Sequence, residues 1–204
     1  MKAPIEFFFD PISPFSYLAT TKIDAIAARH ERQVEWRPTL VGVTVVKVMG
    51  LKPVPETPLK SVYFRHDLRR LAEMFNVPLR QHGLAHVNSL AASRAYLWLR
   101  ERDAEAARQL VKHLSARLWT DALDITAPQT VVDEAKRLGI DTSGMVEALR
   151  SPAVKQKLSD AVQYAIDRNV FGVPFFIVDG EPLWGCDRMW MLDYRLQHGE
   201  WPRL

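Results

Sequence analysis

The residues FFFDPISPFSYLA (7–19) join an apolar strand to a helix, and the organisation of the chain follows from that junction. Residues 5–9 form an apolar run of the kind found in a buried strand. Ser13 and Pro14 then occupy the N-cap and the first helical position, which favour serine and proline respectively. Apolar residues recur at helical spacing beyond them, so we expect a helix from Pro14 to about His30.

The composition is that of an ordinary globular protein with a small positive charge. Of the 204 residues, 48% are hydrophobic and 25% are charged, which is enough apolar material for a core. The formal net charge of +3 is spread along the chain. Such a charge argues against a nucleic-acid partner and suits an anionic small molecule. The single cysteine, Cys186, excludes an intramolecular disulfide and a dithiol redox cycle within the chain.

The sequence predicts no membrane segment. Its first ten residues contain only three consecutive phenylalanines, between Glu6 and Asp10, which is too little for a signal peptide. No apolar run approaches the roughly 20 residues of a membrane span. We therefore expect a cytoplasmic protein that does not bind membranes.

Strand patterns occur at both ends of the chain. VEWRPT (34–39) alternates as a strand does, and with the first strand and helix it predicts a parallel β-α-β unit. PFFIVDGEPLWG (174–185) predicts a hairpin with its turn at Asp179-Gly180. A last helix is expected from about Asp187 to Gln197.

The middle of the chain has helical periodicity throughout, after a proline-rich loop at 50–60. Five helices are predicted there, at 61–75, 88–102, 104–123, 128–139 and 151–169. The expected fold is therefore α/β and thioredoxin-like, with a helical domain inserted between the β-α-β and β-β-α halves. We expect residues 1–50 and 170–204 to form the thioredoxin-like domain and residues 51–169 the insertion.

Three segments carry a resemblance to a known family. DPISPFSYLA (10–19), FGVPFFIVDG (171–180) and WGCDRM (184–189) are similar to segments of the 2-hydroxychromene-2-carboxylate isomerases. These are relatives of the kappa-class glutathione transferases and have the DsbA-like thioredoxin fold. The resemblance spans nearly the whole chain and implies a glutathione-dependent enzyme. Where thioredoxin-like proteins carry Cys-x-x-Cys, this chain carries Ser13 and Ser16, so the sulfur would come from glutathione.

Ser13 is the expected catalytic residue. A free thiol has a pKa near 8.5, so stabilising the thiolate to parity at pH 7 requires about 2 kcal/mol. A hydroxyl that donates to a charged acceptor supplies roughly 1.5–3 kcal/mol. The resemblance implies that the Ser13 hydroxyl contacts the glutathione sulfur; the alternative is a helix N-cap, and the two roles are compatible. Ser16 ranks below it, because a serine one turn into the helix more often bonds to a carbonyl or packs.

Further cofactor-binding residues follow from the resemblance. They are Phe15, Lys60, Val173, Pro174, Cys186 and Asp187. A cis Val173-Pro174 bond is implied, and it would free the Val173 backbone for the cysteinyl peptide of glutathione. Asp187 is expected to accept the cationic amino group of the γ-glutamyl end. The alternatives are an ordinary strand-starting proline at Pro174, a helix cap at Asp187 and a solvated surface charge at Lys60.

The resemblance also implies a substrate side, with Lys47 holding an aromatic carboxylate and Asn88 lining the cleft. The alternatives are a surface charge for Lys47 and a helix N-cap for Asn88. Relatives have Gly-Asn where this chain has Gly50-Leu51, so one polar contact is lost and the cleft becomes more apolar. We expect no metal site, because no carboxylate or cysteine joins His82 and His86.

The expected function is a glutathione-dependent isomerase of 2-hydroxychromene-2-carboxylate or a similar aromatic keto acid, in aromatic degradation. The alternatives are a kappa-like glutathione transferase that conjugates electrophiles, and a non-catalytic glutathione-binding protein. A disulfide oxidoreductase is disfavoured, because neither motif position holds sulfur. The expected partner is a small aromatic carboxylate, and the family also implies a homodimer.

Overall fold

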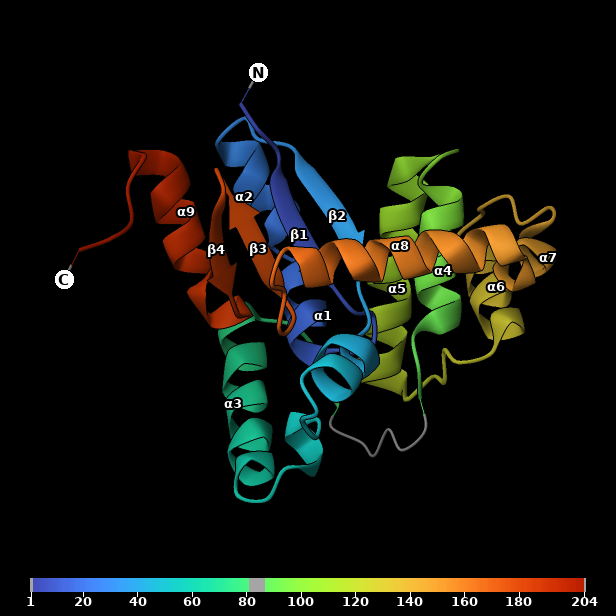
Figure 1. Cartoon of the computed structure of the whole chain (residues 1–204), viewed down its shortest axis with the longest axis horizontal. Coiled ribbons are helices and arrows are strands. Elements are labelled where there is room, and N and C mark those ends of the chain that lie inside the picture. Colours follow the sequence, from blue (N-terminus) through green and yellow to red (C-terminus); the bar gives the residue numbers. More distant parts are fainter. Residues whose placement is uncertain (1, 81–86, 204) are drawn as a thin grey trace.

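The computed structural model describes residues 2–80 and 87–203, and its centre is a mixed four-stranded sheet (Figure 1). The strands are β1 (Ile5–Phe9), β2 (Val34–Pro38), β3 (Phe175–Val178) and β4 (Glu181–Trp184), in the order β2-β1-β3-β4. β1 is parallel to β2, whereas β3 is antiparallel to both β1 and β4. The predicted parallel unit and the predicted hairpin are both confirmed.

Helices make up most of the remaining described chain. They are α1 (Pro14–Thr20), α2 (Ile23–Arg29), α3 (Lys60–Phe75), α4 (Leu90–Leu99), α5 (Ala104–Asp121), α6 (Pro128–Arg137), α7 (Met145–Arg150), α8 (Pro152–Asp167) and α9 (Met189–His198). Three further helical segments, which are not α-helices, are η1 (Gly42–Val48, a π-helix), η2 (Val54–Glu56) and η3 (Cys186–Arg188).

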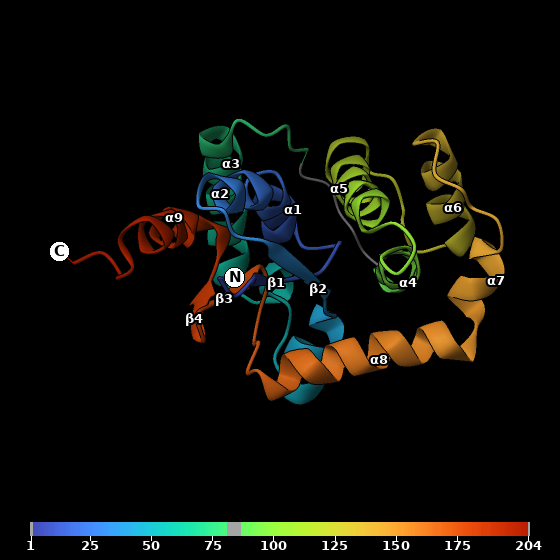
Figure 2. The ribbon, with the colours of Figure 1, turned by 90° about the horizontal axis from the view of Figure 1, so that it is seen from above.

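The sheet lies between two layers of helices. Figure 2 shows α1, α2 and α9 on one face of the sheet and α8 crossing the other. Helices α4, α5, α6 and α7 lie to one side, beyond β2. Because β1 is central and covered on both faces, its side chains can be apolar on both sides.

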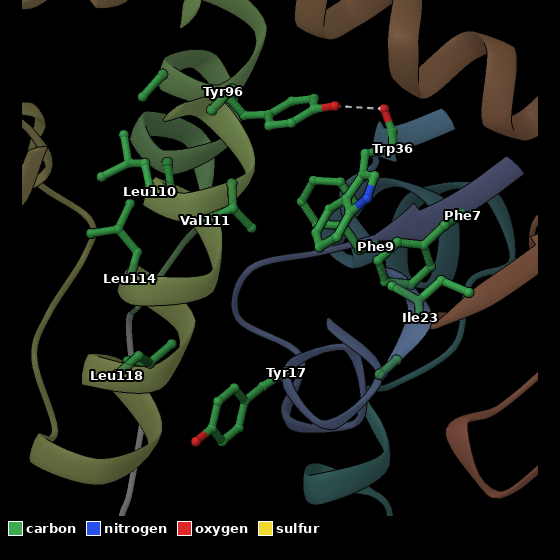
Figure 3. Packing of buried hydrophobic residues seen from close by; sticks show 14 of the residues in the cluster. Phe7, Phe9, Tyr17, Ile23, Trp36, Tyr96, Leu110, Val111, Leu114 and Leu118 are labelled. Atoms are coloured by element: carbon green, nitrogen blue, oxygen red, sulfur yellow. Dashed lines mark hydrogen bonds between the residues drawn. The ribbon is translucent and has the colours of Figure 1, made fainter. Parts of the chain in front are cut away.

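The three phenylalanines of β1 show this two-sided burial. Phe7 and Phe9 belong to the main core (Figure 3), where Phe7 packs on Trp36 with ring centroids 4.9 Å apart. Phe8 points to the opposite face and stacks on Tyr164 of α8. In the main core the hydroxyl of Tyr96 donates to the carbonyl oxygen of Trp36 at 2.9 Å, which attaches α4 to β2.

The first helix differs from its prediction, because the chain forms α1 and α2 in place of one helix from Pro14 to His30. Thr20 and Thr21 lie at the break, and their hydroxyls donate to the carbonyl oxygens of Tyr17 and Leu18 at 2.7 Å. Such local bonds compete with the regular helical pattern.

The helical segment also differs in detail from the five helices expected. The short helix α7 was not predicted, and α3 packs against α1 while α8 crosses the sheet. The main core runs without interruption from the sheet into α4, α5 and α6. The division at residues 50 and 170 stays a prediction. No helix within residues 2–80 and 87–203 has both the length and the apolar character needed to cross a bilayer.

Candidate active site

Ser13 lies at the N-cap of α1, at the point where β1 passes into the helix. The residue is 9% exposed, and its hydroxyl oxygen accepts a hydrogen bond from the backbone N–H of Ser16 at 3.2 Å. Its own N–H donates to the carbonyl oxygen of Asp10 at 2.9 Å. Because the hydroxyl acts as an acceptor in the cap, its hydrogen is available to a ligand. The capping role and the ligand role are therefore compatible in this geometry.

Ser16 has a purely internal environment. It is 1% exposed, and its hydroxyl oxygen accepts a hydrogen bond from the backbone N–H of Asp10 at 3.4 Å. It does not take the carbonyl bond that the sequence suggested, but it is packed away from the surface as expected. Of the two serines in the Cys-x-x-Cys positions, Ser13 is the less buried one.

The loop before β3 lies next to η3. The Val173-Pro174 peptide bond is cis, as predicted. The backbone N–H of Gly185 donates to the carbonyl oxygen of Pro174 at 2.9 Å, and η3 contacts α1. Gly185 has a φ of +101°, and a side chain there would collide with the Asp187 carboxylate. The helix of Ser13, the cis-proline and η3 are thus brought together.

Cys186 is part of this cluster, but its side chain is turned into the core. Only 2% of it is exposed. Burial, with a smaller contribution from the charge of Asp187, raises the pKa of its thiol to about 12. The thiol is therefore protonated at neutral pH and a poor nucleophile. What Cys186 can offer a ligand is the backbone at the start of η3.

Two carboxylates lie around η3. The Asp187 side chain is 48% exposed and lies 3.6 Å from Arg188. The charge of Asp67, on α3, also reaches Cys186. Asp67 was missed in the sequence, although it lies on the same helical face as Lys60 and Phe64, at a spacing of four and then three residues. One oxygen of the Asp67 carboxylate accepts from the Tyr63 hydroxyl at 3.2 Å and from Arg70 at 3.1 Å. The other oxygen is the part of Asp67 that could assist Asp187, to which the cationic amino group was assigned alone.

Helix α3 packs against α1 beside Ser13. Phe15 of α1 packs edge-to-face on Phe64 of α3, with ring centroids 5.3 Å apart. Phe15 is therefore a packing residue that joins the two helices and is also half-buried at the site. Lys60 is exposed in the first turn of α3, one turn from Phe64.

The substrate-side candidates are on separate segments. Lys47 is exposed in the last turn of η1, and Leu51 follows it with 50% of its surface exposed. Asn88 precedes α4, and its side-chain oxygen accepts a hydrogen bond from the N–H of Leu90 at 3.1 Å. The N-cap of α4 is Ser89, so the predicted N-cap alternative for Asn88 is wrong by one residue. The Asn88 side chain bonds the first N–H of the helix from one position earlier, and its amide nitrogen is the group left for a cleft contact.

Asp10 was not expected to be important, yet it is fully buried in the middle of these segments. Its carboxylate accepts hydrogen bonds from the backbone N–H groups of Val41 at 2.8 Å and Ile12 at 3.2 Å, and the Ser89 side chain lies close enough to lower its pKa. Burial raises the pKa of Asp10 to about 6, although these hydrogen bonds oppose the shift. The only signal in the sequence was an acidic residue directly after an apolar strand.

Metal-binding residues do not gather in the described part of the chain. Within residues 2–80 and 87–203, no three His, Cys, Asp or Glu side chains lie close enough together to hold an ion. His82 and His86 lie outside the described residues.

Comparison with known proteins agrees with this geometry. The family model described as the DSBA-like thioredoxin domain matches residues 4–197. The 2-hydroxychromene-2-carboxylate isomerase of Sphingobium xenophagum is 33% identical, over 95% of this chain and 97% of that protein. Glutathione S-transferase kappa 1 of Homo sapiens is 28% identical, over 94% and 90% of the two chains.

Solved structures give the same result. A structure of 2-hydroxychromene-2-carboxylate isomerase superposes with a TM-score of 0.81 at 26% identity, covering 95% of this chain and 94% of that chain. A probable DsbA oxidoreductase from Streptomyces coelicolor has a TM-score of 0.71 at 17% identity, which shows the shared fold. The predicted thioredoxin-like fold of the DsbA type is confirmed. The chain therefore belongs to the DSBA-like thioredoxin family, in the group that contains the 2-hydroxychromene-2-carboxylate isomerases and the kappa-class glutathione transferases.

Proposed function

We propose that this protein is a glutathione-dependent isomerase of 2-hydroxychromene-2-carboxylate or a similar aromatic keto acid. The observation that carries the proposal is Ser13, whose nearly buried hydroxyl caps α1 and keeps its hydrogen for a ligand beside the cis-proline and η3. Its support from relatives is the isomerase that is 33% identical over nearly the whole length of both chains.

The residues around Ser13 fit glutathione chemically. Asp67 and Asp187 offer two carboxylates for the ammonium group of the γ-glutamyl end, and the Val173-Pro174 loop is bonded to Gly185, two residues before Asp187. Lys60, on the face of α3 that carries Phe64 and Asp67, suits a glutathione carboxylate. When bound, glutathione supplies the thiolate nucleophile that the protein lacks, whose reversible addition lets a double bond of the substrate rotate.

The protein contributes charge stabilisation and orientation to this reaction. The Ser13 hydroxyl donates to the sulfur and favours its ionised form. Lys47 neutralises the carboxylate of the substrate, and the apolar surface of η1 and Leu51 faces its aromatic part. Ser13 retains its cap to Ser16 throughout, so the hydroxyl is held in place before the substrate arrives.

Turnover in the presence and absence of glutathione tests the proposal. Purified protein and 2-hydroxychromene-2-carboxylate are followed by absorbance, and conversion to the trans benzylidenepyruvate is expected only when glutathione is added. Conversion at the same rate without glutathione would refute the cofactor. No conversion under either condition would refute the substrate.

A kappa-like glutathione transferase is the second candidate, because the human kappa enzyme is 28% identical over most of both chains. The two reactions differ in the fate of glutathione. An isomerase returns it unchanged, whereas a transferase leaves it bonded to the product. Mass spectrometry of the products after many turnovers separates them. Stable binding of glutathione without either product would indicate the non-catalytic alternative.

The two lysines are expected to act on different Michaelis constants. Lys60→Gln should raise the KM for glutathione, and Lys47→Gln should raise the KM for the aromatic carboxylate. We expect about two- to fivefold in each case, because an ion pair at an exposed side chain is worth roughly 0.2–1 kcal/mol. Steady-state kinetics with each substrate varied in turn measures both. Lys52 is an exposed lysine in the loop between them. Lys52→Gln is therefore the control and should change neither Michaelis constant.

A further inference from the structure

We propose that the Asp10 carboxylate is a positioning residue of this site. It holds three backbone segments in one arrangement: the loop that carries Ser13, the start of η1 with Lys47, and the start of α4 next to Asn88. The inference rests on the proposed function for its effect on glutathione, but the arrangement itself can be measured without any ligand.

The first segment is the loop between β1 and α1. Asp10 makes three bonds here: its carboxylate accepts from the N–H of Ile12, its carbonyl oxygen accepts from the N–H of Ser13, and its own N–H donates to Ser16. The N–H, the carbonyl oxygen and one carboxylate oxygen of Asp10 are thus used to fix the backbone that carries the Ser13 hydroxyl. Because Ser13 also caps α1 through Ser16, moving this loop moves the hydroxyl.

The second segment is η1. The second oxygen of the Asp10 carboxylate accepts from the N–H of Val41 at 2.8 Å, directly before η1 begins at Gly42. Two bonds to the carbonyl oxygen of Leu40, from the N–H groups of Val43 and Thr44, continue the same turn. The segment that ends at Lys47 is therefore attached to the core at its N-terminal end through Asp10.

The third segment is the start of α4. The Ser89 side chain lies close enough to the Asp10 carboxylate to lower its pKa, and Ser89 is 2% exposed. The neighbouring Asn88 receives a second attachment, because its N–H donates to the Thr126 hydroxyl at 3.1 Å. Asp10 therefore connects β1 to the entrance of α4, 79 residues further along the chain (89 − 10).

A side chain with acceptors only matches the donors at this junction better than an amide does. Three donors converge on Asp10, from Ile12, Val41 and Ser89, and only an ionised carboxyl group accepts from all of them without presenting a hydrogen of its own. An asparagine of the same shape would place its NH₂ group against one of the two backbone N–H groups. That variant would lose one attachment and keep the volume of the side chain.

Hydrogen–deuterium exchange of the ligand-free protein tests the arrangement. In Asp10→Asn, amide exchange is expected to accelerate at least tenfold in residues 11–16, 41–49 and 87–93, with little change in α5 or α9. Ser89→Ala removes one donor and leaves both backbone bonds, so acceleration should be confined to 87–93. Asp141→Asn is the matched control, because Asp141 makes the same bond to the N–H two residues on but is exposed between α6 and α7.

Glutathione itself is the second probe. We expect Asp10→Asn to raise the dissociation constant of glutathione about tenfold, as happens when only a tenth of the molecules hold the competent arrangement. The ultraviolet absorbance of the bound thiolate should also fall, because the Ser13 hydroxyl is no longer aimed at the sulfur. If Asp10 acted only through its negative charge, its removal in Asp10→Asn would favour the thiolate. The ultraviolet absorbance of the bound thiolate would then rise.

The outcomes separate the two proposals. Unchanged exchange in the three segments of Asp10→Asn would overturn the positioning role, whatever the protein binds. Accelerated exchange with unchanged glutathione affinity and thiolate absorbance would overturn it as well. If the wild-type protein binds no glutathione, the proposed function fails. The exchange pattern, including that of the milder Ser89→Ala variant, then still decides whether Asp10 holds the segments.

Discussion

Ser13→Ala is expected to lower turnover about 10- to 150-fold, with a much smaller change in glutathione affinity. The variant loses a hydroxyl that donates to a charged sulfur, an interaction worth roughly 1.5–3 kcal/mol. A loss of this kind acts on the stabilised thiolate more than on the binding of the tripeptide, so it appears mainly in kcat. Steady-state kinetics with saturating glutathione measures it, and Ser13→Thr, which keeps a hydroxyl, should retain more activity.

The chain offers a matched control for the helix-capping part of this effect. Ser151 precedes Pro152 as Ser13 precedes Pro14, and its hydroxyl also accepts from the N–H three residues on at 3.2 Å. Ser151→Ala should lose about 1 kcal/mol of stability from its cap and none of its activity. Equal kinetic losses in both variants would mean that Ser13 acts only as a cap.

The second large effect is a pH dependence of stability that comes from Asp10. Its pKa is raised to about 6 by burial, whereas an aspartate in an unfolded chain has a pKa of about 3.9. Below pH 4 the group is protonated in both states and the folded protein has its full stability. As the pH rises to 6 the unfolded state releases its proton first, so stability falls by about 3 kcal/mol from this group.

Urea unfolding of the wild type and of Asp10→Asn between pH 3.5 and 7.5 isolates this contribution, since the other titrating groups are common to both proteins. The stability of the wild type relative to the variant should decrease between about pH 4 and pH 6 and then level off. A difference that stays constant over this range would show that Asp10 is ionised at its ordinary pKa and is not desolvated. Asp141→Asn serves again as the control, because hydrogen bonds from Ser143 lower the pKa of Asp141. The stability of the wild type relative to Asp141→Asn should therefore not decrease between about pH 4 and pH 6.

The parts of the fold that local pattern determines were predictable from the sequence. The apolar run of β1, the alternation of β2 and the Asp-Gly turn of the hairpin are each encoded in adjacent residues, and all three are confirmed. The cis bond at Pro174 was implied by the resemblance, because about 5–6% of X-Pro bonds are cis in folded proteins. The proline alone did not indicate it.

The features that were missed depend on contacts between distant residues or on very short elements. Helix α7 has six residues, too few for a periodic pattern. The segment η1 contains five valines and threonines, a composition that favours strands, and its first turn is attached to Asp10 from outside the segment. The role of Asp10 could not be seen in the sequence, since its partners Val41 and Ser89 are 31 and 79 positions away.

The residues of the candidate site also divide into those that local motifs indicated and those that depend on packing between distant segments. Ser13 and the cis-proline were placed by motifs, and the structure brings their segments together at η3. Cys186 was placed by the same kind of motif, but its orientation depends on core packing, which turns the thiol inward. The charge of Asp67 reaches Cys186 only because α3 packs against α1, and the sequence did not indicate that contact.

The central claim is that the thiolate missing from this thioredoxin fold is supplied by glutathione and stabilised by Ser13. The most direct test is an ultraviolet titration of glutathione bound to the wild-type protein and to Ser13→Ala. The account predicts that the bound thiol ionises well below its solution pKa of about 8.5 in the wild type, and that Ser13→Ala returns it by one unit or more towards that value. A bound thiol that ionises at the same pH in both proteins, or no bound glutathione at all, would contradict it.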